Sequence, residues 1–133
     1  MSIKMKLSAK ATKQLETLAT NLDLRRNIVC RMALAVSLNE KTAPKTDDAD
    51  FSGQEFNKPT IMGTEEQLFN ALIIQHYGRK LPEEELFSKY VRAEIINGLE
   101  IMTADYSKIN SPVQFLEKLC RSYGEIDLQK EDL

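Results

Sequence analysis

Residues 2–8 read Ser-Ile-Lys-Met-Lys-Leu-Ser, and apolar and polar side chains alternate through the whole stretch. The apolar residues at positions 3, 5 and 7 fall on one face, while Lys4 and Lys6 fall on the other with the flanking serines. This period of two predicts a β-strand with one face against a core. Because a single strand does not stand alone, it must pair with another strand, and its copy in a second subunit is one such partner.

Two helices are predicted directly after this strand. Ser8 is a common N-cap residue, and apolar residues recur at helical spacing over residues 9–22. After a short break at 21–25, a second helix is predicted over about 26–39. It is apolar around much of its circumference, as expected in a core or a subunit interface. Arginines at 25 and 26 cannot accept an amide hydrogen bond, so the cap of this helix would fall to Asp23 or to water.

An irregular stretch and three further helices complete the predicted fold. Residues 40–63 are polar and acidic with scattered apolar anchors, which indicates an exposed loop packed along the body. A capping box at 64–67, a proline at 82 and a cap followed by proline at 111–112 each signal a helix start. Gly78 and Gly124 are expected to end the first and the last of these helices.

We therefore expect a single domain over residues 1–133 that is mainly α, with one short N-terminal strand followed by about five helices. A chain of this length is typical of one domain. Its parts are a basic strand–helix–helix front at 1–41, an irregular ordered loop at 42–63, a helical body at 64–124 and an acidic tail at 125–133, which is expected to fray.

Composition narrows the class of protein. Apolar residues make up 42% and charged residues 29% of the chain, as in ordinary globular proteins. No apolar run approaches the roughly 18–20 residues that a membrane helix needs, and the first residues lack the apolar centre of a signal peptide. We expect a cytoplasmic protein with no membrane segment.

Residues that commonly carry catalysis or bind metals are few and scattered. Cys30 and Cys120 lie far apart, and the sequence has no CxxC and no Cys/His cluster, so neither a metal nor another cofactor is expected. Both cysteines are predicted to be core residues. His76, the single histidine, is expected to be structural or solvated at a helix C-terminus, and Glu94 is expected to face solvent. No catalytic residue is assigned, and the protein is not expected to be an enzyme.

Charge is distributed unevenly along the chain. Residues 1–41 carry eight Lys/Arg and three Asp/Glu, a net charge of +5, whereas residues 42–133 carry ten and seventeen, a net charge of −7. A basic front on an acidic body indicates an anionic partner for the front, and nucleic acid is the usual one.

The order of strand, helix, turn and helix resembles a ribbon–helix–helix unit, in which the paired strands of a dimer enter the DNA major groove. In such a unit Lys4 and Lys6 would face the groove. The second helix would offer its N-terminal amides to a phosphate, with Arg25, Arg26 and Asn27 beside them. The alternative is an edge strand whose lysines only prevent aggregation.

A wider set of residues resembles the DndE family, the small subunit of the bacterial DNA phosphorothioation (DNA sulfur modification) system. The matching segments are Leu-Ser at 7–8, Asn-Ile-Val-Cys-Arg at 27–31 with Leu34, Ser-Leu-Asn-Glu at 37–40, Gly-Gln-Glu-Phe-Asn-Lys at 53–58, Thr-Ile-Met-Gly at 60–63, Leu-Phe-Asn-Ala-Leu at 68–72, Arg-Ala at 92–93 and Asn-Gly at 97–98. The chain departs from the family at Glu94, near which members often carry histidine.

The resemblance implies a mostly helical protein that assembles into a homo-oligomer, a tetramer. It would act beside a cysteine desulfurase, an iron–sulfur protein and an ATPase-like subunit in replacing a non-bridging phosphate oxygen by sulfur. It would bind duplex DNA through lysines, with preference for nicked duplex, and would not itself be catalytic. With the basic residues of the front included, the DNA-binding candidates are Lys4, Lys6, Lys10, Lys13, Arg25, Arg26, Asn27 and Arg31.

Three alternative functions are also compatible with the sequence. A ribbon–helix–helix transcriptional repressor would bind one palindromic operator as a symmetric dimer. A DNA-nicking enzyme would need acids clustered beside the basic face, where only Glu16 and Asp23 are close in sequence. An interaction module would use its apolar second helix to hold subunits together while its lysines bind nothing.

Overall fold

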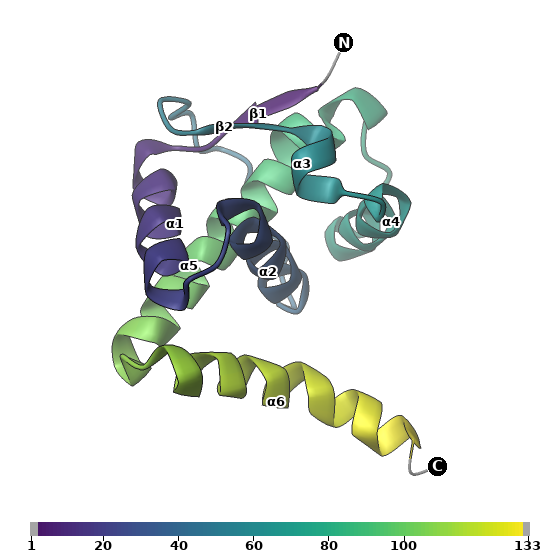
Figure 1. The fold of residues 1–133 in the computed structure, drawn as a ribbon. Helices are drawn as coiled ribbons and strands as arrows, with labels where there is room; N and C mark the ends of the chain where they lie inside the picture. Colours follow the sequence, from purple (N-terminus) through teal and green to yellow (C-terminus); the bar gives the residue numbers. More distant parts are fainter. Residues whose placement is uncertain (1–2, 132–133) are drawn as a thin grey trace.

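The protein is a bundle of helices in which the N-terminal strand forms a short antiparallel sheet with a strand from the middle of the chain (Figure 1). The structure is a computed structural model that describes the backbone of residues 3–131 and the side chains of residues 3–121. The elements, in chain order, are β1 (Lys4–Lys6), α1 (Ala9–Leu22), α2 (Arg26–Leu38), β2 (Glu55–Asn57), α3 (Lys58–Met62), α4 (Glu66–Tyr77), the 3₁₀ turn η1 (Glu83–Glu85), the π-helical η2 (Leu86–Val91), α5 (Arg92–Ile109) and α6 (Pro112–Glu131). The prediction of a mainly α fold with a short N-terminal strand is confirmed.

The N-terminal strand finds its partner within the chain. β1 pairs antiparallel with β2, with Met5 opposite Phe56 and Lys6 opposite Glu55. The middle residue of each strand is buried and its neighbours are exposed, so β2 has the same period of two as β1 but over only three residues. The expected pairing with a second subunit is therefore replaced by pairing with a segment that the sequence predicted to be irregular.

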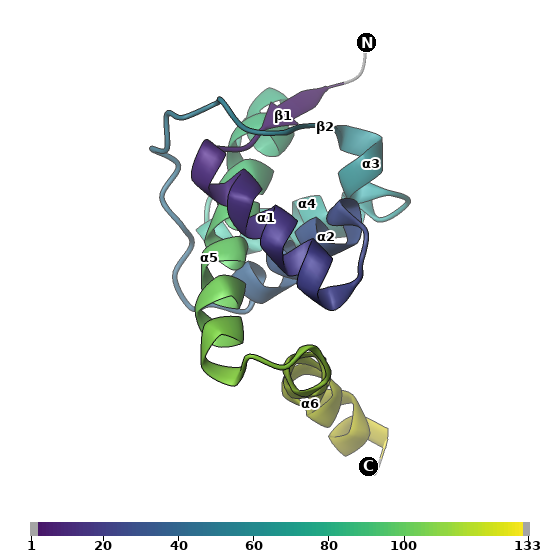
Figure 2. The ribbon, with the colours of Figure 1, turned by 60° about the vertical axis from the view of Figure 1, so that its left-hand side comes forward.

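Helix α5 lies at the centre of the bundle, and both α1 and α2 pack against it (Figures 1 and 2). The contact between α2 and α5 is close enough to exclude a side chain at Gly98, because a Cβ there would lie 1.8 Å from the carbonyl oxygen of Ala33. The core around this contact is aliphatic and includes Leu34, Ile95 and Leu99, each fully buried.

The predicted helix ends are correct in part. The Ser8 side chain accepts a hydrogen bond from Ala11 N at the start of α1, and Gly78 ends α4 in the left-handed region. Asp23 does not cap α2 but ends α1, also in the left-handed conformation. The N-terminus of α2 at Arg25 has no side-chain cap.

Two other helix limits predicted from sequence are wrong. The capping box at 64–67 does not form, since α4 begins after Glu65 with no side-chain cap bond. α6 continues through Gly124 to Glu131, so the predicted stop and the separate tail are replaced by one long helix. A glycine inside a helix costs only about 1 kcal/mol relative to alanine, which does not end a helix whose following residues favour it. Among the residues that the structure describes, no helix is both long and apolar enough to cross a membrane.

Candidate nucleic-acid interface

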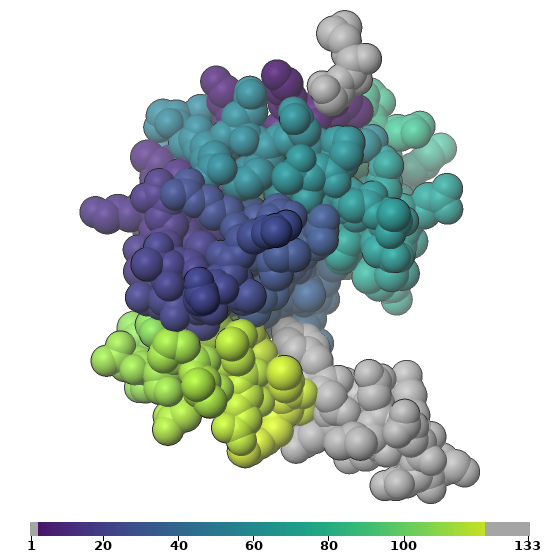
Figure 3. Space-filling model, in the orientation of Figure 1, coloured from purple at the N-terminus to yellow at the C-terminus, as the bar shows by residue number. Residues whose placement is uncertain are grey.

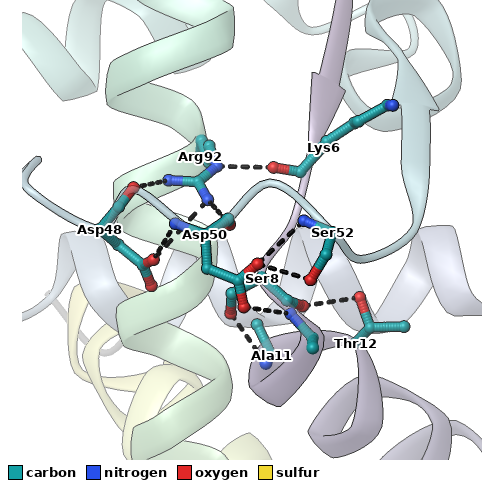
Figure 4. A network of polar contacts seen from close by, with 9 residues as sticks. Lys6, Ser8, Ala11, Thr12, Asp48, Asp50, Ser52 and Arg92 are labelled. Carbon is teal, nitrogen blue, oxygen red and sulfur yellow. Dashed lines mark hydrogen bonds and ion pairs between the residues drawn. The ribbon is translucent and has the colours of Figure 1, made fainter.

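Arg92 fixes the position of the basic front against the central helix. Its guanidinium donates three hydrogen bonds to main-chain carbonyls: Nε to Lys6 O (2.6 Å), Nη1 to Asp48 O (2.7 Å) and Nη2 to Asp50 O (Figure 4). The side chain is 5% exposed, lies 3.9 Å from the Asp48 carboxylate and stacks on the Phe51 ring. Because these carbonyls come from β1 and from the 48–50 loop, one buried cation holds both segments to α5.

The 48–54 loop is hydrogen-bonded to the start of α1. The Asp50 carboxylate accepts from Ala9 N at 3.0 Å and from the backbone and hydroxyl of Ser52. Gln54 N donates to Thr12 Oγ1 at 2.8 Å. The hydrogen bonds from Ser52, and then that from Ala9, hold the pKa of Asp50 below its ordinary value. This network makes β1, the loop and the first turns of α1 one platform (Figure 4).

Gly53 is required for the close approach in this platform. A Cβ at this position would lie 2.1 Å from Thr12 Oγ1 and 2.3 Å from the carbonyl oxygen of Ser8. The backbone of Gly53 donates to Leu7 O at 2.8 Å, and Leu7 N donates to Gln54 O at 3.0 Å. The loop therefore runs directly along the strand–helix junction.

Four predicted DNA-binding lysines lie on this platform and all are exposed. Lys4 and Lys6 are on the outward face of β1, and Lys10 and Lys13 are in the first turns of α1. Lys4 lies 3.6 Å from Glu55 and Lys10 lies 3.7 Å from Glu100, in pairs that are largely exposed. Within the described residues, Lys6 and Lys13 form no ion pair.

The candidates at the start of α2 divide into two kinds. Arg25 is exposed at the N-cap of α2, next to the half-buried Asn27. Arg26 donates to Gln54 Oε1 at 2.6 Å and lies 3.6 Å from Glu16. Arg31 donates to the carbonyls of Ile61 and Thr60 and so ties α2 to α3, which makes it a structural residue. The structure thus leaves Lys4, Lys6, Lys10 and Lys13 exposed on β1 and the first turns of α1, whereas Arg31 has a structural role.

A buried histidine–glutamate pair lies away from this platform and was missed from sequence. His76 Nδ1 lies 2.6 Å from Glu94 Oε1, and His76 Nε2 lies 2.7 Å from the carbonyl oxygen of Glu40. The side chains of His76 and Glu94 are 6% and 0% exposed, so the expectation that Glu94 faces solvent is wrong. Burial raises the pKa of Glu94, and the hydrogen bond and charge of His76 oppose that shift.

The sequence contains a signal for this pair. Glu94 has the buried Val91 three residues before it and the buried Gly98 four residues after it, which places it on the buried side of the helix. An acid at such a position needs a partner, and the single histidine is the one that could become charged near neutral pH. The two side chains tie α4 to α5, and the bond to Glu40 also ties in the end of α2.

The two cysteines have different environments. Cys30 is fully buried, and burial raises the pKa of its thiol to about 12, which keeps it protonated and unreactive. Cys120 is exposed on α6, so the prediction that it is a core residue is wrong. Among the residues described here, no three His, Cys, Asp or Glu side chains are grouped so as to hold a metal ion.

Comparison with known proteins places this fold. DndE from Escherichia coli B7A, involved in DNA phosphorothioation modification, superposes with a TM-score of 0.61 at 23% identity, over 73% of this chain and 92% of that chain. A mutant DndE with two glycines changed to lysine gives 0.60 at 22% identity, over 76% and 96%. At identities this low, the superpositions show that the two proteins share the fold of this chain.

No curated protein matches the sequence of this chain. The model of DNA sulphur modification protein DndE matches residues 4–110, which cover β1 to the end of α5 and so both the basic platform and the His76–Glu94 pair. The chain therefore belongs to the DndE family of DNA sulphur modification proteins.

Proposed function

We propose that this protein is a non-catalytic DNA-binding subunit of the phosphorothioate modification complex, acting in the bacterial cytoplasm. It binds the phosphate backbone of duplex DNA through the side chains of Lys4, Lys6, Lys10 and Lys13. The observation that carries the proposal is that these four exposed cations stand on one strand–helix junction that Arg92 and Asp50 hold in place.

The contacts available to this surface are contacts to phosphate. Lysine presents a compact positive charge on a flexible stem and carries no fixed geometry for reading a base edge. Phosphate contacts fix position and supply affinity without sequence information. The subunit therefore binds all sequences similarly, and other proteins of the modification system supply sequence choice.

A preference for nicked duplex follows from the cost of deforming DNA. Bending an intact site costs on the order of 1–6 kcal/mol, and a nick frees one strand to bend at less cost. A homo-oligomer, a tetramer in this proposal, would present several copies of the lysine platform, and contact with more than one of them requires the DNA to follow their arrangement. The nicked duplex then retains more of the contact energy.

The test is fluorescence anisotropy on three labelled duplexes of one sequence, nicked, intact and gapped, with a scrambled sequence of each as the control. We expect tight, salt-dependent binding that favours the nicked duplex and does not change with sequence. Binding confined to one palindromic sequence would instead identify a repressor. Cleavage of supercoiled plasmid in the presence of Mg²⁺ would contradict the non-catalytic part of the proposal.

A further inference from the structure

The outward face of α4 carries no charged side chain. Its six exposed residues are Gln67, Leu68, Ala71, Leu72, Ile74 and Gln75, whereas Ile73 points into the core. Leu68 is 54% exposed, and Leu72 and Ile74 are each 37% exposed. Three of the six large apolar side chains that are exposed in the described part of the chain thus belong to this one helix. Helix α4 lies on the right-hand side of the molecule in Figure 3. Such a patch marks an interaction surface.

A hollow lies beside this face. It has a volume of about 300 Å³ and is lined by Leu38, Lys41, Leu72, Gln75 and His76. Leu68 is two helical turns from Gln75 on the same side of α4, because residues seven apart share a face. The face therefore presents a protruding leucine at one end and a hollow at the other.

The two ends of α4 also carry opposite charges. Exposed Glu65 precedes the helix, and exposed Arg79 and Lys80 follow it after Gly78. Neither Lys80 nor Arg79 forms an ion pair among the described residues, and Arg79 contacts the Tyr90 side chain. An antiparallel copy of this helix would place acid beside cation at both ends, and the helix dipoles would also oppose each other.

We propose that the α4 face binds the same face of a second copy of this chain, about a two-fold axis that passes near Ala71 and Leu72. In this arrangement Leu68 of one copy lies beside Gln75 of the other and enters the hollow there. Glu65 lies beside the 78–80 segment of the other copy. The small side chain of Ala71 allows the two helices to approach closely at the axis.

A two-fold contact of one surface with itself is isologous and closes as a dimer. This contact would be one interface of the homo-oligomer in the proposed function. It rests on the oligomeric part of that proposal and does not depend on DNA binding. The platform lysines lie on β1 and α1, which are separate elements from α4. The two claims therefore fail independently.

The first test is sedimentation equilibrium on the wild type and on Leu72→Glu and Leu68→Glu. Val113→Glu is the matched control, because Val113 is 74% exposed and lies on α6. We expect both α4 variants to weaken self-association on the order of a hundredfold in Kd, since each buries a charge in the interface. The control should associate like the wild type. A monomeric wild type, or α4 variants that associate normally, would overturn the proposal.

A second test measures proximity at the axis directly. In a Cys120→Ser background the remaining Cys30 is buried, so Ala71→Cys introduces the single accessible thiol among the described residues, and Val113→Cys serves as the control. We expect mild oxidation to give a disulfide-linked dimer of the Ala71→Cys protein much faster than of the control. Equal rates would contradict a two-fold axis at Ala71.

Charge reversal tests the orientation of the two helices. Glu65→Lys or Lys80→Glu alone should weaken association, because each places like charges together at both ends of the pair. The double variant should restore it. If the double variant associates no better than the single variants, the helices are not antiparallel. Anisotropy on nicked duplex, measured on the same proteins, separates loss of the interface from loss of DNA binding.

Discussion

At the scale of single residues, the structure depends on two buried charged groups that the core would not tolerate alone. Arg92 donates to main-chain carbonyls and lies beside the Asp48 carboxylate, and Glu94 Oε1 pairs with His76, while Glu94 Oε2 is buried with no hydrogen-bond partner among the described residues. Both belong to α5 and both bind segments far away in sequence. Each therefore converts a local helix into a tertiary connection.

The His76–Glu94 pair should contribute strongly to stability. We expect His76→Ala to lower the free energy of unfolding by about 3–5 kcal/mol, because it leaves a carboxylate buried without its partner. Urea unfolding at neutral pH measures this. Lys4→Ala is the control: it breaks an ion pair that is about half exposed and should cost under about 1 kcal/mol. Similar losses in the two variants would show that the buried pair has no special role.

Asp50 should make the platform sensitive to acid. The pKa of Asp50 is lowered in the folded protein by the hydrogen bonds from Ser52 and Ala9, so the unfolded chain binds this proton more readily. The stability contribution is present above the ordinary Asp pKa of about 3.9 and is lost as the pH falls through the lower folded value.

The Asp50→Asn variant isolates that contribution. We expect it to be less stable than the wild type near neutral pH, and we expect the difference to shrink at pH values below the ordinary Asp pKa. Urea midpoints across an acid pH series measure both. A difference that stays constant over this series would contradict the assignment.

At the scale of elements, the long amphipathic helices and the N-terminal strand could be predicted from sequence, and the short elements β2 and α3 could not. α1, α2 and α5 each have enough turns to show their apolar face. β2 and α3 span three and five residues, which is too short for any period to be recognised, and their formation depends on β1 and on Arg31. The sequence therefore predicts the strand β1 but does not predict its partner β2.

The contact between α2 and α5 allows a direct test of packing. Gly98→Ala should cost about 1–3 kcal/mol or more, because its Cβ would meet the backbone of Ala33 rather than a movable side chain. Gly78→Ala is the matched control, because a Cβ at this position meets open space. Its only cost is the left-handed backbone at φ +68°, which should lower stability by about 1 kcal/mol. Denaturant midpoints give both values. A larger loss at Gly78 would show that the interhelical contact is looser than described.

At the scale of the whole molecule, the sequence predicted a basic front but not how its charges are used. Net charge along the chain identified residues 1–41, and the four lysines on β1 and the first turns of α1 are all exposed. Arg31 counts equally in that sum, yet it donates to the carbonyls of α3, and Arg26 pairs with Glu16 and Gln54 at the surface. Only the fold separates cations that hold the chain together from cations that face solvent.

Two lysines on the platform form no ion pair within the described residues, so they should carry a large share of phosphate contact. The Lys6→Ala, Lys13→Ala double variant keeps every described hydrogen bond and ion pair of the platform. Lys108→Ala, Lys118→Ala is a control of equal charge, because both lysines are exposed and Lys118 lies on α6, beyond the family match.

The measurement that tests the central claim most directly is the affinity of these three proteins for nicked duplex across a salt series. We expect the platform variant to bind more weakly at every sequence and to lose about 2 from the slope of log K against log salt per bound subunit. The control variant should keep the slope of the wild type. If the control and the platform variant lose the same slope, or if the wild type does not bind at low salt, the β1–α1 platform is not a DNA-binding surface.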